Sequence, residues 1–179
     1  MTKIFIDPGH GGINPGAVAA SGLEESSITL DIGLRLGRIL KNRGFDVNYS
    51  RIDNSTVTLA ERARLANNWD ADYFVSIHCN SNTDPVYKGT STYCFALETT
   101  AASLALYINN ALVEQINTPD LGVMTANFAV LRRTKMPAVL VETAFLSNPE
   151  EAELLSLPAF REQCAVGIAN GISNFIDMQ

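Results

Sequence analysis

Two kinds of hydrophobic pattern alternate along this chain. In residues 26–44 the apolar positions are 28, 32, 36, 39 and 40, and a glycine closes the stretch at position 44. This spacing places the apolar side chains on one face of a helix, and a glycine directly after basic residues is a typical helix end. Residues 3–6, 72–78 and 137–143 are instead short apolar runs, which are typical of buried strands.

Applied to the whole chain, the two patterns predict an alternation of strands and helices. We expect strands at 3–6, 45–50, 72–78, 91–97, 128–132 and 137–143, and helices at 26–44, 58–69, 100–116, 147–155 and 158–176. Two helices begin with a capping-box pattern, Thr58 with Glu61 and Ser147 with Glu150. The alternation predicts an α/β fold with a mostly parallel, twisted sheet of about six strands and helices on both faces.

Composition is consistent with one globular domain. Hydrophobic residues make up 46% of the chain and charged residues 18%. No repeat or linker divides the sequence, so we expect residues 1–179 to form a single domain. The three cysteines, Cys79, Cys94 and Cys164, include no CxxC spacing, so no disulfide framework is expected. Cys94 lies in an apolar run and is expected in the core.

Charge and hydropathy exclude several classes of partner. A net charge of −6 argues against nucleic acid, and we interpret the one basic stretch, LRRTK at 131–135, as a solvated loop. No apolar run approaches the ~20 residues that a membrane span needs. Only three apolar residues separate Lys3 from Asp7, so no signal peptide is expected. We expect either a cytosolic protein without an export signal or a module of a longer exported protein.

Ionisable residues follow three of the expected strands. His10 and His78, the only two histidines, come at or just after the first and third strands, and Glu142 comes at the end of the run PAVLVE. Because ligands bind outside the carboxyl ends of parallel strands, we expect these three side chains to meet at one edge of the sheet. A glutamate after an apolar strand is costly unless it is paired, hydrogen-bonded or close to a metal ion.

Two imidazoles at separate strand ends indicate a zinc site. A catalytic zinc ion usually has three protein ligands and one position for water, so a carboxylate is needed as the third ligand. Glu24 and Glu25, just ahead of the first expected helix, can supply it. Glu142 is then free to act as a general base.

Less specific roles account for each residue taken alone. Acidic residues at a helix start are stabilised by the helix dipole, which is sufficient for at least one of Glu24 and Glu25. Glu142 could cap the next turn through backbone N–H groups, and a histidine after a strand is often a core or rim residue. The metal site is therefore predicted from the joint placement of these residues, and the choice between Glu24 and Glu25 stays open.

Five ordered blocks resemble the zinc-dependent N-acetylmuramoyl-L-alanine amidases of bacterial autolysins and phage endolysins. The blocks are IDPGHGG, GLEESSITLDIGLRL, VTLAERARLANNWDADYFVSIHCNS, GTSTYCFAL and MPAVLVETAFLSNPEEAELL, and the resemblance runs from Lys3 to about Ile176. It implies a peptidoglycan hydrolase that cleaves the amide between the lactyl group of N-acetylmuramic acid and the L-alanine of the stem peptide. It also implies one Zn²⁺ ion with three protein ligands and a water molecule.

The resemblance assigns roles motif by motif. His10, Glu25 and His78 fall on the zinc ligands, and the spacing after G-L-x selects Glu25 over Glu24. Glu142 falls on the catalytic acid/base. Cys79 stands where relatives commonly have Ala or Val, and we expect it to pack in the core without a ligand role. Gram-negative relatives carry an inserted segment after the strand that corresponds to GTSTYCFAL; this chain lacks it, which implies an uncovered site.

Substrate contacts and the place of action are less constrained by the sequence. Asn80 can contact substrate or serve only as a turn residue, Arg132 is a candidate for lining the groove, and Arg51 with Asp53 is interpreted as a structural pair. The expected partner is peptidoglycan, bound by a monomer acting on the bacterial cell wall. The competing interpretations are a non-catalytic peptidoglycan-binding module, a zinc carboxypeptidase, and a structural zinc protein with Cys79 as a fourth ligand.

Overall fold

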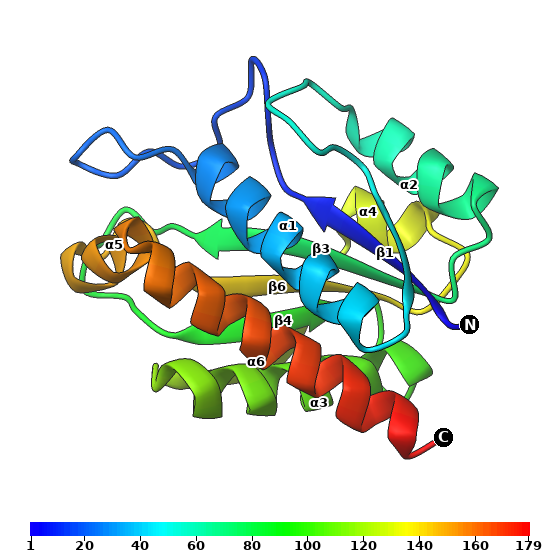
Figure 1. The fold of residues 1–179 in the computed structure, drawn as a ribbon. Coiled ribbons are helices and arrows are strands. Elements are labelled where there is room, and N and C mark those ends of the chain that lie inside the picture. Colours follow the sequence, from blue (N-terminus) through cyan, green and yellow to red (C-terminus); the bar gives the residue numbers. More distant parts are fainter.

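Six strands form a single sheet in the order β2-β1-β3-β6-β4-β5 (Figure 1). The computed structural model describes all residues from Met1 to Gln179. The strands are β1 (Lys3–Pro8), β2 (Asp46–Tyr49), β3 (Tyr73–Asn80), β4 (Thr90–Cys94), β5 (Asp120–Thr125) and β6 (Ala138–Phe145). The helices are α1 (Glu25–Asn42), α2 (Leu59–Asn68), α3 (Thr100–Ile116), α4 (Ala129–Arg133), α5 (Pro149–Ser156) and α6 (Pro158–Asp177).

The strand directions confirm the predicted, mostly parallel α/β sheet. Strands β2, β1, β3 and β6 run parallel to one another. Strand β4 pairs antiparallel with β6, and β5 then pairs parallel with β4. The carboxyl ends of β1, β3 and β6 therefore lie side by side, which is the condition that brings their terminal residues together.

One strand was predicted in the wrong place. The predicted strand at 128–132 is replaced by helix α4 (Ala129–Arg133), and the sixth strand is β5. The run FAVLR is too short for its period to be read, and Val130 and Leu131 are buried against the sheet as one helical face. Strand β5 lies at the sheet edge with no fully buried position and contains Gly122, so it carries no strand-like hydrophobic pattern.

The two capping predictions had different outcomes. The Thr58 hydroxyl accepts a hydrogen bond from the backbone N–H of Glu61, as predicted. At α5 the cap is Asn148, which accepts from the N–H of Glu151, one residue later than predicted. Pro149 is the first residue of the helix, where its missing N–H costs nothing. The residue before it, Asn148, is therefore the N-cap.

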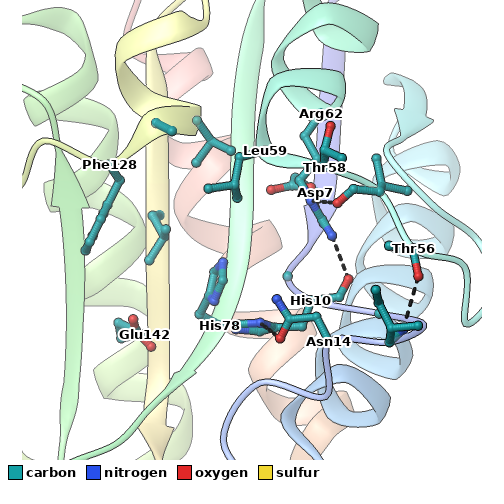
Figure 2. Close-up of a pocket in the computed structure, with 17 residues that line it drawn as sticks. Asp7, His10, Asn14, Thr56, Thr58, Leu59, Arg62, His78, Phe128 and Glu142 are labelled. Atoms are coloured by element: carbon teal, nitrogen blue, oxygen red, sulfur yellow. Dashed lines mark hydrogen bonds and ion pairs between the residues drawn. The ribbon is translucent and has the colours of Figure 1, made fainter.

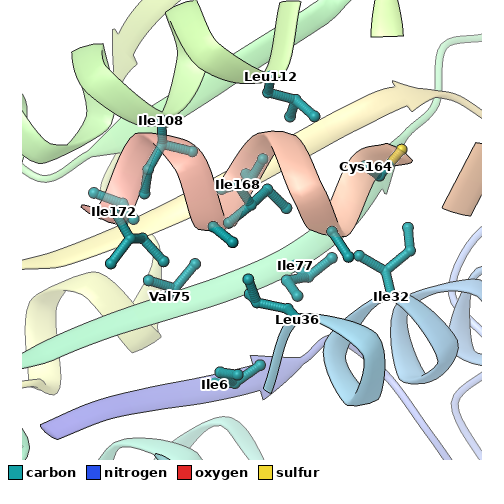
Figure 3. Close-up of a cluster of buried hydrophobic side chains, with 14 of the residues drawn as sticks. Ile6, Ile32, Leu36, Val75, Ile77, Ile108, Leu112, Cys164, Ile168 and Ile172 are labelled. Atoms are coloured by element: carbon teal, nitrogen blue, oxygen red, sulfur yellow. The ribbon is translucent and has the colours of Figure 1, made fainter. Parts of the chain in front are cut away.

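Alternating residues of the strands face two hydrophobic layers. Ile4 and Ile6 belong to the larger core beneath α1, α3 and α6, whereas Phe5 faces a smaller cluster under α2 and α4. Figure 3 shows the larger core, where Ile32 and Leu36 of α1 approach the sheet beside α6. Helices thus cover both faces, as predicted, and none of the six is long and apolar enough to span a membrane.

Helices α3 and α6 pack closely because a glycine lies at their contact. A Cβ added at Gly171 would lie 2.4 Å from the Cα of Ile108 and 2.7 Å from the carbonyl oxygen of Tyr107. Backbone atoms cannot move aside as a flexible side chain can, so the two helices would have to separate.

We therefore expect Gly171→Ala to destabilise the protein by about 1–3 kcal/mol, because overpacking outweighs the ~1 kcal/mol gained from helix propensity. The matched control is Asn174→Ala on the exposed face of the same helix, which should change stability little. Urea unfolding followed by circular dichroism measures both. Equal urea midpoints for the two variants would show that a side chain at position 171 does not force α3 and α6 apart.

Candidate active site

Three neighbouring parallel strands bring the candidate residues to one edge of the sheet. His78 and Glu142 are direct register partners in β3 and β6, so their side chains emerge on the same face of the sheet. His10 follows β1, which pairs with the other side of β3. Glu25 is the first residue of α1 and is 4% exposed. The predicted meeting of both histidines with an acidic residue is thus observed.

The loop that carries His10 is held by two buried arginines. His10 has a φ of 62°, a left-handed conformation that is unfavourable for a residue with a side chain. Arg62 donates to the carbonyl oxygens of Pro8 at 2.7 Å and of His10 at 2.6 Å. Arg51 donates to the carbonyl oxygens of Pro8 and Gly9, both at 2.9 Å. These bonds stabilise the strained turn that directs the imidazole toward Glu25.

Ion pairing accounts for the burial of Arg62. Its guanidinium lies 2.8 Å from Asp7, which is fully buried and also accepts a hydrogen bond from Ser76. The predicted pairing of Arg51 with Asp53 is made only to the Asp53 backbone carbonyl, because the Arg51 guanidinium is mainly engaged by the loop before His10. Burial, together with the nearby Arg62, lowers the pKa of Arg51 to about 10, so Arg51 stays charged near neutral pH.

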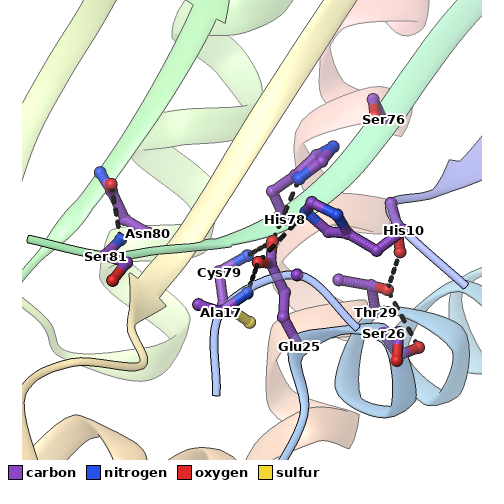
Figure 4. Close-up of polar contacts among 12 residues, drawn as sticks. His10, Ala17, Glu25, Ser26, Thr29, Ser76, His78, Cys79, Asn80 and Ser81 are labelled. Carbon is purple, nitrogen blue, oxygen red and sulfur yellow. Dashed lines mark hydrogen bonds and ion pairs between the residues drawn. The ribbon is translucent and has the colours of Figure 1, made fainter. Parts of the chain in front are cut away.

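Glu25 joins the two imidazoles (Figure 4). Its Oε2 atom lies 3.1 Å from His10 Nε2, and its Oε1 atom lies 3.1 Å from His78 Nδ1. Both oxygens also accept backbone hydrogen bonds, from Ala17 at 2.9 Å and Cys79 at 3.0 Å. One donor atom from each of His10, Glu25 and His78 falls within 4.8 Å of the others, close enough for all three to bind one metal ion.

Proton positions around His10 favour a cation in this cluster. The Asn14 side-chain oxygen accepts from the backbone N–H of Gly16, and His10 Nδ1 lies 3.1 Å from the same oxygen. Nδ1 therefore carries the proton, and a neutral ring turns the lone pair of Nε2 toward the Glu25 carboxylate. Two lone pairs repel unless the ring is protonated or a metal ion lies between them. The donor set thus fits a metal ion with nitrogen and oxygen ligands.

The charges of the cluster are coupled. Burial alone would raise the pKa of Glu25, but hydrogen bonds from His10 and His78 outweigh it and hold that pKa well below its usual value. Burial opposes charge on His78, yet the carboxylates of Glu25 and Glu142 raise its pKa. Glu25 therefore stays ionised, as a metal ligand must be.

A glycine makes room for the cluster. Gly16 has a φ of 71°, and an added Cβ would lie 2.5 Å from Glu25 Oε2 and 2.6 Å from the His10 ring. Any side chain here would push Glu25 and His10 apart. The residue is required by both its backbone conformation and its close approach to the donor atoms.

Glu142 is the one acidic residue with a buried side-chain oxygen that has no hydrogen-bond partner. Its Oε2 atom is buried and unpaired, so the alternative of a turn-capping role does not hold. Burial raises the pKa of Glu142 to about 7, although the nearby His78 partly offsets the effect. A buried, unpaired carboxylate close to neutrality is suited to accept and release a proton.

An open cleft of about 490 Å³ gives access to this edge (Figure 2). His10, His78 and Glu142 line it together with apolar walls from four segments, which include Ile13, Val57, Leu59, Phe128, Val130 and Leu140. Three of the wall residues are unusually exposed for their type: Ile13 at 90%, Leu59 at 56% and Phe128 at 38%. The cleft is thus mainly apolar, with its ionisable groups at one side.

The other candidate residues lie outside this cleft lining. The Glu24 carboxylate approaches only the Ser26 hydroxyl, so the structure places Glu25, not Glu24, against the imidazoles. The Asn80 side chain accepts from the N–H of Ser81, and Arg132 donates to Asn127. Cys79 packs in the larger core, with its thiol near Thr143. Substrate contacts by Asn80 and Arg132 stay predictions.

The residues that position the histidines carry little signal in the sequence. Asn14 and Gly16 appear in the run NPG, which reads as an ordinary turn, and Arg62 occupies a helical position that reads as solvated. The role of Arg62 depends on partners 52 to 55 residues away, such as Asp7. The only local signal is the crowding of glycines on both sides of His10.

The fold and the site define an enzyme of the α/β class, with a candidate metal centre at the carboxyl ends of its parallel strands. The chain belongs to the N-acetylmuramoyl-L-alanine amidase family, whose model matches residues 4–174.

Individual relatives agree with this assignment. The chain is 40% identical to N-acetylmuramoyl-L-alanine amidase CwlM of Bacillus licheniformis, over 99% of its own length and 70% of the relative's. It is 39% identical to the sporulation-specific N-acetylmuramoyl-L-alanine amidase of Bacillus subtilis, over 100% and 70% of the two lengths. The solved catalytic domain of CwlV from Bacillus (Paenibacillus) polymyxa var. colistinus superposes with a TM-score of 0.94 at 34% identity and covers both chains fully.

The contact of Asn14 with His10 generates a prediction. We expect Asn14→Ala to weaken metal binding about 10–100-fold, because His10 loses the acceptor that fixes its tautomer and ring orientation. Asn14→Asp keeps an acceptor at this position and should bind more tightly than Asn14→Ala. Competition with a chelator of known zinc affinity measures the constants, with Asn174→Ala as the control. Unchanged affinity in Asn14→Ala would contradict the positioning role.

Proposed function

We propose that this chain hydrolyses the amide between the lactyl group of N-acetylmuramic acid and the L-alanine of the stem peptide, using one Zn²⁺ ion and Glu142. Family membership supports the reaction. The observation that carries the mechanism is the Glu25 carboxylate shared between two imidazoles, beside the unpaired Glu142 at an open cleft.

His10, Glu25 and His78 would hold the zinc ion. Three protein donors leave one position open, the ligand count typical of a catalytic rather than a structural zinc site. When bound, zinc polarises the carbonyl of an amide and lowers the pKa of a coordinated water to about 7. A fourth protein ligand is not favoured, because the nearest thiol, Cys79, is buried in the core on the other face of the sheet.

Glu142 is the proposed general acid and base. Its ionised form accepts a proton from the attacking water in the cleft. The same carboxyl then donates a proton to the alanine nitrogen, which is a poor leaving group without it. Its partial burial beside an apolar wall keeps the proton affinity high enough for both steps near neutral pH.

The cleft is built from one chain and is not covered by an inserted segment. Strand β4 is followed after five residues by α3, so we propose a monomer with a permanently accessible site. The proposed place of action is the bacterial cell wall, where the peptidoglycan substrate lies. A peptidase acting within the stem peptide is the competing activity, and its products differ: only the amidase releases free lactyl groups together with new alanine N-termini.

The reaction is tested with purified cell walls. We expect Glu142→Gln to keep one zinc ion per chain and to lose at least about 10²-fold in turnover, because the proton shuttle is removed. His10→Ala and His78→Ala should lose both zinc and activity. Product amines and metal content are measured together. Wild-type turnover in Glu142→Gln, or full activity and zinc in either histidine variant, would refute the mechanism.

Glu142 also makes the stability of the metal-free protein depend on pH. Its folded pKa of about 7 lies above the usual 4.5, so ionisation penalises the folded state increasingly from about pH 4.5 to 7 and constantly above that. Glu142→Gln cannot ionise. The difference in free energy of unfolding between Glu142→Gln and the wild type should therefore increase, in favour of the variant, by up to about 3 kcal/mol from pH 5 to pH 8.

Urea unfolding of chelator-treated protein at the two pH values measures this difference. The free energy of unfolding of Glu142→Gln minus that of the wild type should be larger at pH 8 than at pH 5. A gap that is the same at both pH values would show that Glu142 has an ordinary pKa in the folded protein.

A further inference from the structure

A second unpaired polar atom lies beside Glu142. Ser91 of β4 is fully buried, and its hydroxyl has no hydrogen-bond partner. A buried hydroxyl without a partner costs free energy. Only four buried side-chain polar atoms lack a partner in this protein, and Ser91 Oγ and Glu142 Oε2 are two of them.

Strand register places Ser91 directly opposite Glu142. In the antiparallel pairing of β4 with β6, Ser91 pairs with Glu142, Thr92 with Val141 and Tyr93 with Leu140. Directly opposed residues project to the same face of a sheet, with Cβ atoms about 4.5–5.5 Å apart. The two unpaired groups are therefore neighbours on one face.

Contacts of the flanking residues identify that face as the cleft side. Thr92 points the other way, because its hydroxyl donates to Asn109 of α3. Tyr93 packs against the smaller hydrophobic cluster and contacts the ring of Phe128, which lines the cleft. Ser91 alternates with Thr92 and thus lies with Tyr93 on the side of Glu142. Ser91 is not among the residues that line the cleft.

We propose that Ser91 is a positioning residue whose hydroxyl donates a hydrogen bond to the Glu142 carboxylate when that carboxylate accepts a proton. A rotation of the two side chains pairs both unpaired atoms. The bond occupies one carboxylate oxygen from behind and leaves the other facing the cleft. It also holds the carboxylate back from the donor cluster of Glu25 and the histidines. The inference rests on the proposed role of Glu142.

Ser91→Ala tests the inference, with Ser50→Ala as the matched control. Ser50 also has a buried, unpaired hydroxyl, but it follows β2, three strands from β6. We expect Ser91→Ala to lower kcat about tenfold or more, as for a lost hydrogen bond to a charged group. KM, zinc content and thermal stability should stay unchanged, since no native hydrogen bond is lost. Ser50→Ala should match the wild type in all four.

Two further measurements separate positioning from a general structural effect. Ser91→Thr retains the hydroxyl and should recover most of the lost kcat. The acidic limb of the kcat–pH profile should move to higher pH in Ser91→Ala, because the ionised Glu142 carboxylate loses a donor during the reaction, and it should return in Ser91→Thr.

The possible failures are distinguishable. If Glu142→Gln is inactive while Ser91→Ala keeps a kcat within twofold of the wild type, the role of Ser91 is overturned and the proposed function stands. Loss of zinc or of thermal stability in Ser91→Ala would likewise overturn it, because Ser91 would then be structural. Wild-type turnover in Glu142→Gln would overturn both.

Discussion

The Glu25 carboxylate is the group on which the geometry of the site depends. Each of its oxygens faces one imidazole and accepts one backbone N–H. A buried charge of this kind is stable only when it is fully paired. Two of the four contacts come from the segment between β1 and α1 and two come from β3, so they fix the position of α1 relative to β1 and β3. Loss of any one would leave a buried negative charge undercompensated.

Two buried arginines also help to fix the geometry of the site, although neither contacts Glu25. Arg51 and Arg62 lie beneath the turn at His10 and use their donors mainly on backbone carbonyls. Such burial is expensive, and the protein offsets it through Asp7 and a dense set of hydrogen bonds. The result is a loop that is held in an unfavourable backbone conformation, which fixes the imidazole before any ligand arrives. Rigidity at the site is thus built from buried polar contacts rather than from the hydrophobic core.

Glu142 and Ser91 show the opposite arrangement. Both present unpaired polar atoms, and they are register partners in β4 and β6. Natural proteins satisfy most buried polar groups, so exceptions concentrate where a reaction needs them. The site therefore combines a fully bonded donor cluster with an under-bonded acid one strand away. This contrast separates the residues that would hold a metal ion from the residue that would move protons.

The sequence by itself determined the α/β class, five of the six strands, and the meeting of His10, His78 and an acidic residue. These follow from local hydrophobic period and from the rule that parallel strand ends share an edge. It did not determine β5, whose edge position leaves no pattern, or α4, whose five residues are too few to show a period. Nor did it reveal Asn14, Arg62 or Ser91 as parts of the site. Their roles depend on partners brought together by strand register and buried charge pairing, and those interactions exist only once the chain has folded.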